Sequence, residues 1–404
     1  MSYRELFIGI DVSKFKHDVA IMTEFKQLLR PPFVIGNDKH GFRSLLNICK
    51  QLRQKYGVEK FYVGMEATSD YWKNLYYFLK TQSQFSVTVI NPLQTKAFAQ
   101  SNLRRAKTDP INAQDIALFM VERRPPASVD RAPEYEIIKD IDRQIYHLKK
   151  QQTMVVNKLR LELTKVAPEL EAATKSIATK QMLALLVHYP TAEAIATASV
   201  DELRRLRYGD HRWHLPLSFI HRVKTLTQDS IAFKRGDGAG CVVQSLARFL
   251  TTIQQEVAQL KHQAKELYHV AKEQQSLLAT IPGISEDTAI ILEAYIGDVH
   301  RFANAKKLVA YFGMNPVVSL SGVPKKNTFS FLQKKGNPIV RAKLFMATLS
   351  MIRFKIEPIY SFYKRLVDSG KPKLVAINAA MRKLLVIIYH MLKNNEPFKN
   401  NKNQ

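Results

Sequence analysis

Four residues in the first part of the chain have side chains that bind divalent cations: Asp11, Glu66, Asp109 and Asn112. Asp11 ends the apolar run LFIGID, and Glu66 ends the run FYVGME. Both runs are typical of buried strands. Carboxylates brought together from separate strands repel one another unless a cation neutralises them. The pattern therefore predicts a site for Mg²⁺ or Mn²⁺.

The charge of the chain indicates what such a site acts on. Lys and Arg outnumber Asp and Glu by 61 to 35, which gives a net charge of +26 spread along all 404 residues. Phosphate is the natural partner of so basic a protein, and nucleic acid is favoured over a membrane surface. Paired cations held by several oxygen ligands support phosphoryl transfer. We therefore expect metal-dependent cutting of nucleic acid.

The third and fourth ligands are open to more than one interpretation. Asp109 precedes Pro110, as an ordinary helix N-cap does, although a cap leaves one carboxylate oxygen for a metal. In a helix that begins at Pro110, Asn112 lies about 60° around the axis from Asp109, and Asp115 about 120°. Asn112 is therefore better placed, although its amide supplies no charge. Asp115 is expected to be a solvated helix residue.

Apolar patterning predicts a mixed α/β domain over residues 1–125, with its site at the carboxyl ends of the strands. Strands are expected within 6–23, as two strands joined around 13–16, and at 60–66 and 86–91. Helices are expected at about 40–56, 70–81 and 110–122. Pro125 and Pro126 end the domain.

Two long helices are expected in the middle of the chain. Apolar residues, with Gln152 in the same register, are spaced by three and four from Ile138 to Leu159, and apolar residues are spaced likewise from Ile253 to Ala271, which is typical of a coiled coil. We expect an antiparallel arm over 126–275 with an inserted basic subdomain at about 170–240, which contains Trp213. The arm is either a structural spacer or a dimerisation element.

Residues 276–393 predict a mostly α-helical, basic domain, and residues 394–404 a disordered tail. The segment from Leu278 to Ser285 resembles a helix-hairpin-helix, whose turn offers N–H groups to phosphate; a plain turn between core helices is the alternative.

Ser321 and Gly322 are followed in the sequence by many lysines and arginines. Such surroundings suit a serine that attacks a phosphodiester, although most such pairs are turns.

Other features exclude some classes of protein. No signal-peptide core follows Met1, and no uninterrupted apolar run reaches the length of a membrane span. Cys49 and Cys241 are far apart in apolar contexts, so we expect buried thiols without a zinc site. These features predict a cytoplasmic protein.

The motifs together resemble the insertion-sequence transposases typified by the Piv and MooV invertases. Those enzymes pair a RuvC-like, RNase H-like DEDD domain with a C-terminal serine domain. The resemblance runs to about residue 355. The motifs that carry it are GIDVSK from Gly9, MEAT from Met65, KTDPINA from Lys107, IPGI from Ile281, YFGMNP from Tyr311, Ser321-Gly322, and KGN from Lys335 with Arg341.

The resemblance implies a mechanism and partners. Asp11, Glu66 and Asp109 would be the first three ligands, and Ser321 would become covalently joined to DNA. The family has Asp where this chain has Asn112, so the fourth ligand is altered. The family also implies a guide noncoding RNA, donor and target DNA, dimers or tetramers, and a prokaryotic cytoplasm.

Three alternatives remain open. One is a hydrolytic junction nuclease that uses only the acidic site, and another is a non-catalytic nucleic-acid-binding relative. A sugar-kinase-like ATPase would need a second glycine-rich phosphate loop, which the sequence lacks. The cations expected to contact nucleic acid are Lys14, Arg104, Arg105, Lys107, Arg204, Arg205, Arg207, Arg212, Lys325, Lys326, Lys334, Lys335 and Arg341.

Overall fold

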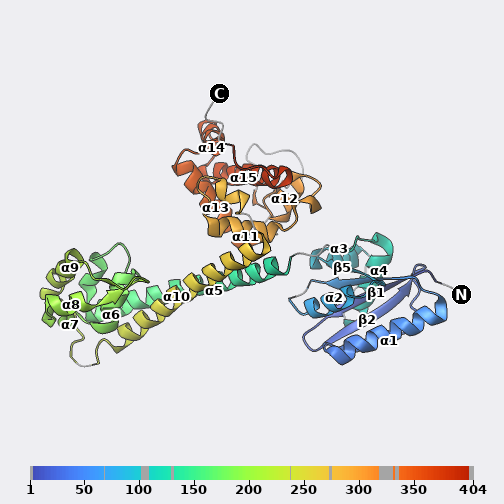
Figure 1. Ribbon diagram of the computed structural model, residues 1–404, viewed down its shortest axis with the longest axis horizontal. Coiled ribbons are helices and arrows are strands. Elements are labelled where there is room, and N and C mark those ends of the chain that lie inside the picture. The colour runs from blue at the N-terminus through green and yellow to red at the C-terminus, as the bar shows by residue number, and fades with distance from the viewer. Residues whose placement is uncertain are drawn as a thin grey trace. The chain divides into compact units, whose positions relative to one another are not determined.

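The computed structural model describes residues 3–67, 69–101, 109–128, 132–236, 238–272, 275–317, 331–332 and 336–399. The chain forms two compact units, Met1–Asp130 and Arg131–Gln404 (Figure 1). The first boundary lies close to the prolines at which we expected a domain to end. The expected further division of the second unit near residue 275 stays a prediction.

The first unit is built on a mixed five-stranded sheet in the order β3-β2-β1-β4-β5. The neighbours β1–β2 and β2–β3 are antiparallel, whereas β4 is parallel to both β1 and β5. The mixed α/β prediction is therefore confirmed, although the short β3 was not expected. The strands are β1 (Glu5–Val12), β2 (Lys16–Thr23), β3 (Phe33–Gly36), β4 (Lys60–Glu66) and β5 (Phe85–Ile90).

Helices cover both faces of this sheet. Residues of β1 alternate between them: Leu6 and Ile8 pack in one core with α1 and α2, whereas Phe7 packs in the other with α3 and α4. This alternation follows from the period of two along a strand. Helix α3 was not expected. The helices are α1 (Lys39–Tyr56), α2 (Trp72–Lys80), α3 (Pro92–Ser101) and α4 (Asp109–Arg123).

Helix α4 crosses β1 so closely that only glycine fits at Gly9. A Cβ there would lie 2.1 Å from the carbonyl oxygen of Ala113 and 2.2 Å from the nitrogen of Ala117. Both are backbone atoms of α4, so the helix as a whole would have to move. Gly64 lies opposite Gly9 in the parallel pairing, but a Cβ there would meet the flexible side chain of Met120.

We therefore predict that Gly9→Ala destabilises the first unit more than Gly64→Ala does. The Gly9 substitution is expected to cost about 3 kcal/mol, the upper end for overpacking, because backbone must shift. Urea unfolding measures this, with Trp72 as the reporter in a Trp213→Phe background, since these are the two tryptophans of the chain. Equal losses in the two variants would contradict the close approach of α4.

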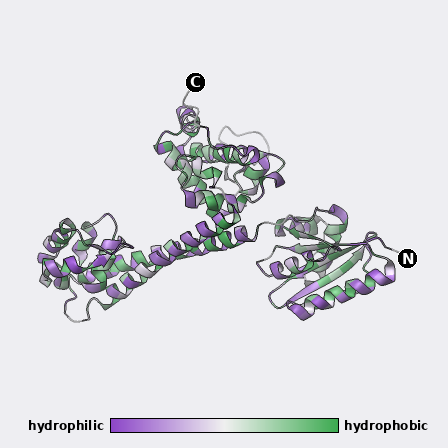
Figure 2. Cartoon of the chain, in the orientation of Figure 1, coloured by the Kyte–Doolittle hydropathy of each residue, from purple (hydrophilic) through white to green (hydrophobic). Residues whose placement is uncertain are grey.

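Two long helices, α5 (Pro133–Val166) and α10 (Cys241–Ala271), pack along one another in the second unit. The rings of Tyr135 and Tyr268 stack with centroids 6.4 Å apart, so the start of α5 lies beside the end of α10 and the pair is antiparallel. Figure 2 shows hydrophilic and hydrophobic residues interspersed along both helices, as amphipathic partners require.

The chain between these helices forms a smaller helical body. Its core includes Leu163 of α5 and Leu250 of α10. A two-stranded hairpin of β6 (Arg207–Tyr208) and β7 (Trp213–His214) connects two of its helices along the chain. Its other elements are η1 (Pro168–Ala172), α6 (Lys180–His188), α7 (Ala192–Thr197), α8 (Val200–Arg205) and α9 (Leu217–Gln228).

The C-terminal region is mostly helical, as expected. Leu292, Leu344 and Leu384 are fully buried in a core that also takes in Ile138 of α5. A two-residue strand pair, β8 (Pro316–Val317) and β9 (Phe331–Leu332), also belongs to this region. Its helices are η2 (Leu277–Thr280), α11 (Glu286–Ile296), η3 (Val299–Arg301), α12 (Ala305–Tyr311), α13 (Pro338–Arg353), α14 (Ile359–Asp368) and α15 (Lys373–Asn394).

Helix α15 has the length and composition of a membrane-crossing helix, but many of its apolar residues are buried in the core. Two expectations about this unit need correction. Cys241 is exposed at the start of α10, whereas Cys49 is buried. The tail is described as far as Lys399: Phe398 packs against the core, and its N–H donates to Thr280 Oγ1 at 2.9 Å.

Candidate active site

Two of the expected carboxylates, Asp11 and Glu66, stand at the same edge of the sheet. Ile10 pairs with Met65 in the parallel register, so Asp11 and Glu66 follow at the ends of neighbouring strands. Both are half-buried. Gly9 on β1 lies against α4, and Asp11 is two residues further on, so it faces α4 as well.

A further acid, Asp18, belongs to the same edge. It lies directly opposite Asp11 in the antiparallel β1–β2 pair and is buried. Directly opposite residues share a face of the sheet, so Asp18 faces α4 too. We did not expect this residue, because an acid inside an apolar strand is also typical of a solvent-facing position.

The neighbouring His17 faces the opposite side of the sheet. It is fully buried and its ring stacks on that of Phe42, with centroids 6.2 Å apart. Burial lowers the pKa of His17 below its usual value, against weaker opposing contributions from hydrogen bonds and from Asp18. His17 is therefore a neutral core residue and does not point toward Asp11.

Helix α4 brings Asn112 to Asp11. The Asn112 Nδ2 atom donates a hydrogen bond to Asp11 Oδ2 at 3.1 Å, across 101 positions of sequence. This contact depends on the close crossing at Gly9, since Ala113 follows Asn112 directly. Asp109 is the first residue of α4, but its side chain lies outside the part of the chain that the structure describes.

Glu66 is held from another helix. The Thr95 hydroxyl on α3 has two acceptors within reach of its one proton, Glu66 Oε1 at 3.0 Å and the carbonyl oxygen of Pro92 at 3.1 Å. Thr95 is itself buried, so it restricts the orientation of the carboxylate. No spacing in the sequence pointed to Thr95, because α3 itself was not expected.

The oxygen donors fit a hard divalent cation. Asp11 and Glu66 supply charge, and the Asn112 amide supplies a neutral oxygen once it turns its Oδ1 inward. Among the described side chains, which omit Asp109, no group of three His, Cys, Asp or Glu residues has the geometry of a metal site. Asp115 is buried, so its expected role as a solvated residue is wrong.

We predict that Asn112→Asp destabilises the metal-free protein and strengthens its response to metal. The variant loses the 3.1 Å hydrogen bond and sets a second carboxylate against Asp11, a loss of about 1.5–3 kcal/mol. Mn²⁺ should then raise the melting temperature more than in the natural chain, because the site gains a charge. Scanning fluorimetry with and without Mn²⁺ measures both effects.

Gln114→Glu is the matched control for this prediction. It adds the same charge to a half-buried position of α4, about 200° around the helix axis from Asn112. It should leave the response to Mn²⁺ unchanged. Equal shifts in the two variants would remove position 112 from the metal site.

The expected nucleic-acid contacts differ in their surroundings. Lys14 is exposed, with its Nζ 4.9 Å from the centre of the Phe15 ring. Arg341 is half-buried, and its Nη1 donates to the carbonyl oxygen of Phe312 at 3.5 Å, so it supports the fold. Four exposed arginines border the β6–β7 hairpin: Arg204, Arg205, Arg207 and Arg212.

The remaining expected residues lie outside the described part of the chain. They include the serine proposed as nucleophile, so its surroundings stay a prediction. These residues are Arg104, Arg105, Lys107, Ser321, Lys325, Lys326, Lys334 and Lys335.

The segment expected as a helix-hairpin-helix has a different form. Only α11 follows the turn as an α-helix, and the four-residue η2 precedes it. Gly283 has φ +92°, and a Cβ there would meet Met351 of α13 at 3.2 Å. Ile281 and Ile284 are buried. The turn therefore packs between core helices.

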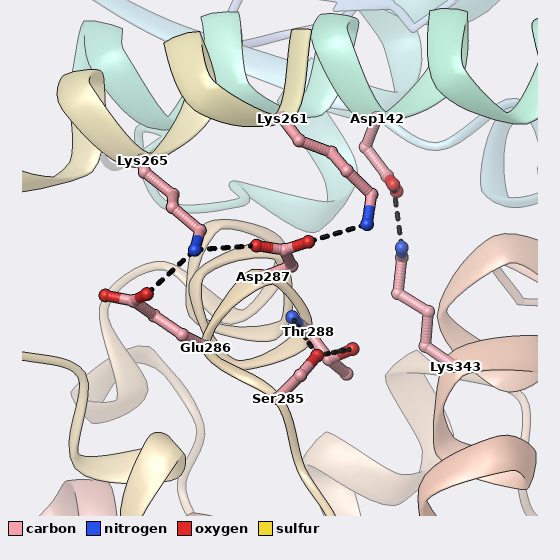
Figure 3. Close-up of polar contacts among 8 residues, drawn as sticks. All are labelled: Asp142, Lys261, Lys265, Ser285, Glu286, Asp287, Thr288 and Lys343. Carbon is pink, nitrogen blue, oxygen red and sulfur yellow. Dashed lines mark hydrogen bonds and ion pairs between the residues drawn. The ribbon is translucent and has the colours of Figure 1, made fainter. Parts of the chain in front are cut away.

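Figure 3 shows that the start of α11 is acidic and already paired. Asp287 accepts from Lys261 at 2.7 Å, and Glu286 accepts from Lys265 at 2.9 Å. Nearby, Lys343 of α13 pairs with the buried Asp142 of α5 at 2.8 Å. Acids in the first turn of a helix disfavour a phosphate there, so these contacts do not support the expected phosphate site.

Both units are similar in sequence to known proteins. Residues 8–168 match the DEDD transposase model of IS110 elements, and residues 275–364 match the transposase model of the IS116/IS110/IS902 family. Over 97% of both chains, the protein is 25% identical to the pilin gene-inverting protein of Moraxella bovis. It is also 23% identical to the uncharacterized 43.6 kDa protein of insertion element IS110 of Streptomyces coelicolor, over 96% of this chain and 94% of that protein.

A shorter match falls on one part of the chain. The transposase for insertion element IS1111A of Coxiella burnetii is 31% identical over 91 residues, which are 22% of this chain and 24% of that protein. The two family models together cover more than half of the chain, and the inverting protein extends the likeness over nearly all of it. The chain belongs to the IS110/IS116 family of insertion-sequence transposases.

Proposed function

We propose that this chain is the recombinase of its own insertion sequence, which cuts and exchanges DNA strands under the guidance of a noncoding RNA. The observation that carries the proposal is the contact between Asp11 and Asn112, with Glu66 at the end of the strand that pairs with β1. These residues come from separate elements and meet at the edge of the sheet within the matched DEDD region. A pilin gene-inverting protein among the relatives supports DNA rearrangement as the activity.

The topology of the first unit supports an RNase H-like, RuvC-like fold. Three antiparallel strands, β3, β2 and β1, continue into the parallel strands β4 and β5. Asp11 lies near the end of β1, and Glu66 ends the neighbouring strand β4. Such a placement suits nucleic-acid cleavage, because a phosphate reaches the sheet edge without crossing the core.

We assign the metal site to Asp11, Glu66 and Asp109, with Asn112 as a neutral fourth ligand. A bound Mg²⁺ or Mn²⁺ would neutralise charge on the phosphate that reacts. The residues of the chain orient the site. Thr95 orients Glu66, and the amide of Asn112 orients Asp11.

Ser321 is the proposed nucleophile. Its hydroxyl loses a proton and forms a P–O bond to the phosphodiester, while the bond to the leaving sugar oxygen breaks and that oxygen takes up a proton. A phosphoserine linkage stores the energy of the broken diester, so strands can be rejoined without another energy source. A hydrolytic junction nuclease would leave free DNA ends and need no serine.

The proposed partners are donor DNA, target DNA, a guide RNA and further copies of the chain. The net charge of +26 supports nucleic-acid binding, although charge alone does not separate RNA from DNA. Dimers or tetramers would join two DNA substrates, and the long α5–α10 pair offers an extended surface for assembly. The proposed location is the cytoplasm of a prokaryotic cell, on the nucleoid when DNA is bound.

Sequencing of co-purifying RNA, combined with a plasmid recombination assay, tests this proposal. The protein should retain one RNA species encoded by its own element, and recombination should require that RNA. Recombination at full rate without RNA would show that the enzyme needs no guide RNA. Absence of strand exchange with RNA, metal and both DNA sites present would contradict the recombinase itself.

A charge-removal series tests the surface that grips nucleic acid. Changing Arg204, Arg205, Arg207 and Arg212 together to Gln should weaken RNA binding and flatten its salt dependence, by up to about 0.7 in slope for each single-strand phosphate that is no longer neutralised. Anisotropy titrations at several salt concentrations measure this. Four exposed cations on α1, changed likewise, are the control: Lys39, Arg43, Lys50 and Arg53. Equal losses of affinity in the two variants would show a general effect of net charge.

A further inference from the structure

The β6–β7 hairpin presents an aromatic ring to solvent. Trp213 is 61% exposed, although a tryptophan ring contributes more than most side chains when it is buried. Its strand pairs Tyr208 with Trp213, and the turn between them has positive φ at Gly209 (+74°) and Arg212 (+51°). The turn therefore holds Trp213 at the end of a tight ribbon.

The hairpin is held in place by contacts on both strands. Gln181 of α6 donates to the Tyr208 hydroxyl at 2.9 Å, and Lys180 pairs with Asp210 at 3.0 Å. On the other strand, His214 Nδ1 lies 2.6 Å from the carbonyl oxygen of Arg204. The ring is thus displayed by an anchored support, which lowers the conformational entropy that a ligand would have to remove.

The surroundings of the ring combine stacking with positive charge. The His211 ring stacks beside Trp213, with centroids 6.1 Å apart and planes inclined by 26°. Arg207 and Arg212 lie on the hairpin itself, and Arg207 Nη1 donates to the carbonyl oxygen of Arg212 at 3.4 Å. Arg204 and Arg205 form the last turn of α8. The only acid on the hairpin, Asp210, is already paired with Lys180.

This arrangement fits an unpaired nucleotide better than a duplex. Inside a duplex the faces of the bases are covered by their neighbours, so an exposed indole finds only phosphates and sugar edges. An unpaired nucleotide offers both an open face for stacking and a phosphate for arginine. A protein partner would have to cover several exposed guanidinium groups with matching acids.

We propose that the β6–β7 hairpin is a stacking platform for unpaired nucleotides, with a base on Trp213 and phosphates on Arg207, Arg212 and the end of α8. The inserted body would then select single-stranded loops of RNA or melted DNA. This inference rests on the proposed function in that the enzyme acts with nucleic acid, but it does not depend on guided strand exchange.

Tryptophan fluorescence tests the platform directly, because the chain has two tryptophans. In full-length protein with Trp72→Phe, Trp213 is the only tryptophan, and excitation on the long-wavelength side of tyrosine absorption selects its emission. A 12-nucleotide oligothymidine should quench its emission, whereas a duplex of equal length should quench it much less at the same saturation. Saturated binding of the oligonucleotide without quenching would overturn the proposal, because it would place the bases elsewhere.

Substitutions supply the second readout. Trp213→Ala should weaken binding of the oligonucleotide roughly 5- to 150-fold, the range for loss of one stacked base, and Trp213→Phe should lose less. Phe233→Ala is the matched control, since Phe233 is 72% exposed in the same inserted body but lies off the hairpin. Equal losses at Trp213 and Phe233 would overturn the proposal, as would unchanged affinity in Trp213→Ala.

The recombination assay separates this inference from the proposed function. Quenching and selective loss at Trp213, in a protein that exchanges no strands, would leave the platform standing and contradict the recombinase. Strand exchange by a protein whose Trp213 emission ignores nucleic acid would do the reverse. Near-ultraviolet circular dichroism of each variant confirms that the fold is retained.

Discussion

Asp11→Asn should reduce DNA strand cleavage by more than about a hundredfold while leaving the protein folded. The partners that only orient metal ligands cost about 10- to 100-fold when removed, so loss of a ligand charge should cost more. Asn has nearly the shape of Asp, and Asp11 is half-buried at a strand end, so packing around it should change little. Cleavage of labelled DNA in Mg²⁺ measures the effect.

Asp70→Asn is the control for this experiment. It removes the same charge from an exposed residue of the first unit, which pairs with Lys73 at 2.8 Å, and should leave cleavage unchanged. Cleavage retained by Asp11→Asn at a rate near that of the natural chain would show that the edge of the sheet is not the reaction site.

The second large effect is expected at Ser321. Ser321→Ala should reduce strand exchange to background, because alanine has no oxygen to form the bond to phosphorus. Ser319→Ala, a change of the same kind two residues away, should retain exchange. Time courses on paired donor and target DNA measure both. Exchange retained by Ser321→Ala at the level of Ser319→Ala would mean that Ser321 is not required in the reaction.

A mixture of two inactive variants asks whether one site is shared between subunits. About 200 residues separate Asp109 from Ser321, including the long α5–α10 pair, which permits a site built from two chains. Asp11→Ala mixed with Ser321→Ala should then recover some exchange in mixed oligomers. Confirmed mixed assembly without recovery would place the whole site in one chain.

Local sequence patterns predicted where the residues of the proposed acidic site lie along the chain. Apolar runs located β1 and β4, each with a carboxylate, Asp11 or Glu66, at its carboxyl end. The helical angle placed Asn112 near Asp109, and the contact between Asn112 and Asp11 agrees with that choice. Each step needed only local geometry and one fact about sheets, that neighbouring parallel strands end at the same edge.

Other parts of the site depend on tertiary contacts that no local pattern carries. β3 has four residues, which is too short for a clear alternation. Helix α3 mixes polar and apolar residues around its axis. The sequence therefore predicted neither the helix nor the contact of Thr95 with Glu66. An aspartate on a helix is usually at the surface, so the sequence favoured an exposed Asp115. Helix α4 is instead enclosed by the sheet on one side and by α3 on another, and Asp115 is buried.

The helix-hairpin-helix shows the limit of a short motif. The IPGI segment does form a turn with Gly283 at positive φ, but its isoleucines are buried and the following acids pair with lysines of α10. The motif is compatible with both phosphate binding and core packing. Only the neighbours, far away in sequence, decide between them.

In the proposed reaction a serine of this chain carries the DNA strand during exchange, and mapping of the covalent product tests that step. The protein would react with element-end DNA and Mg²⁺, be denatured, and be digested with protease and nuclease before mass spectrometry. We expect a nucleotide joined through phosphate to the peptide that contains Ser321. Strand cleavage that leaves only free DNA ends, with no nucleotide on any peptide, would contradict it.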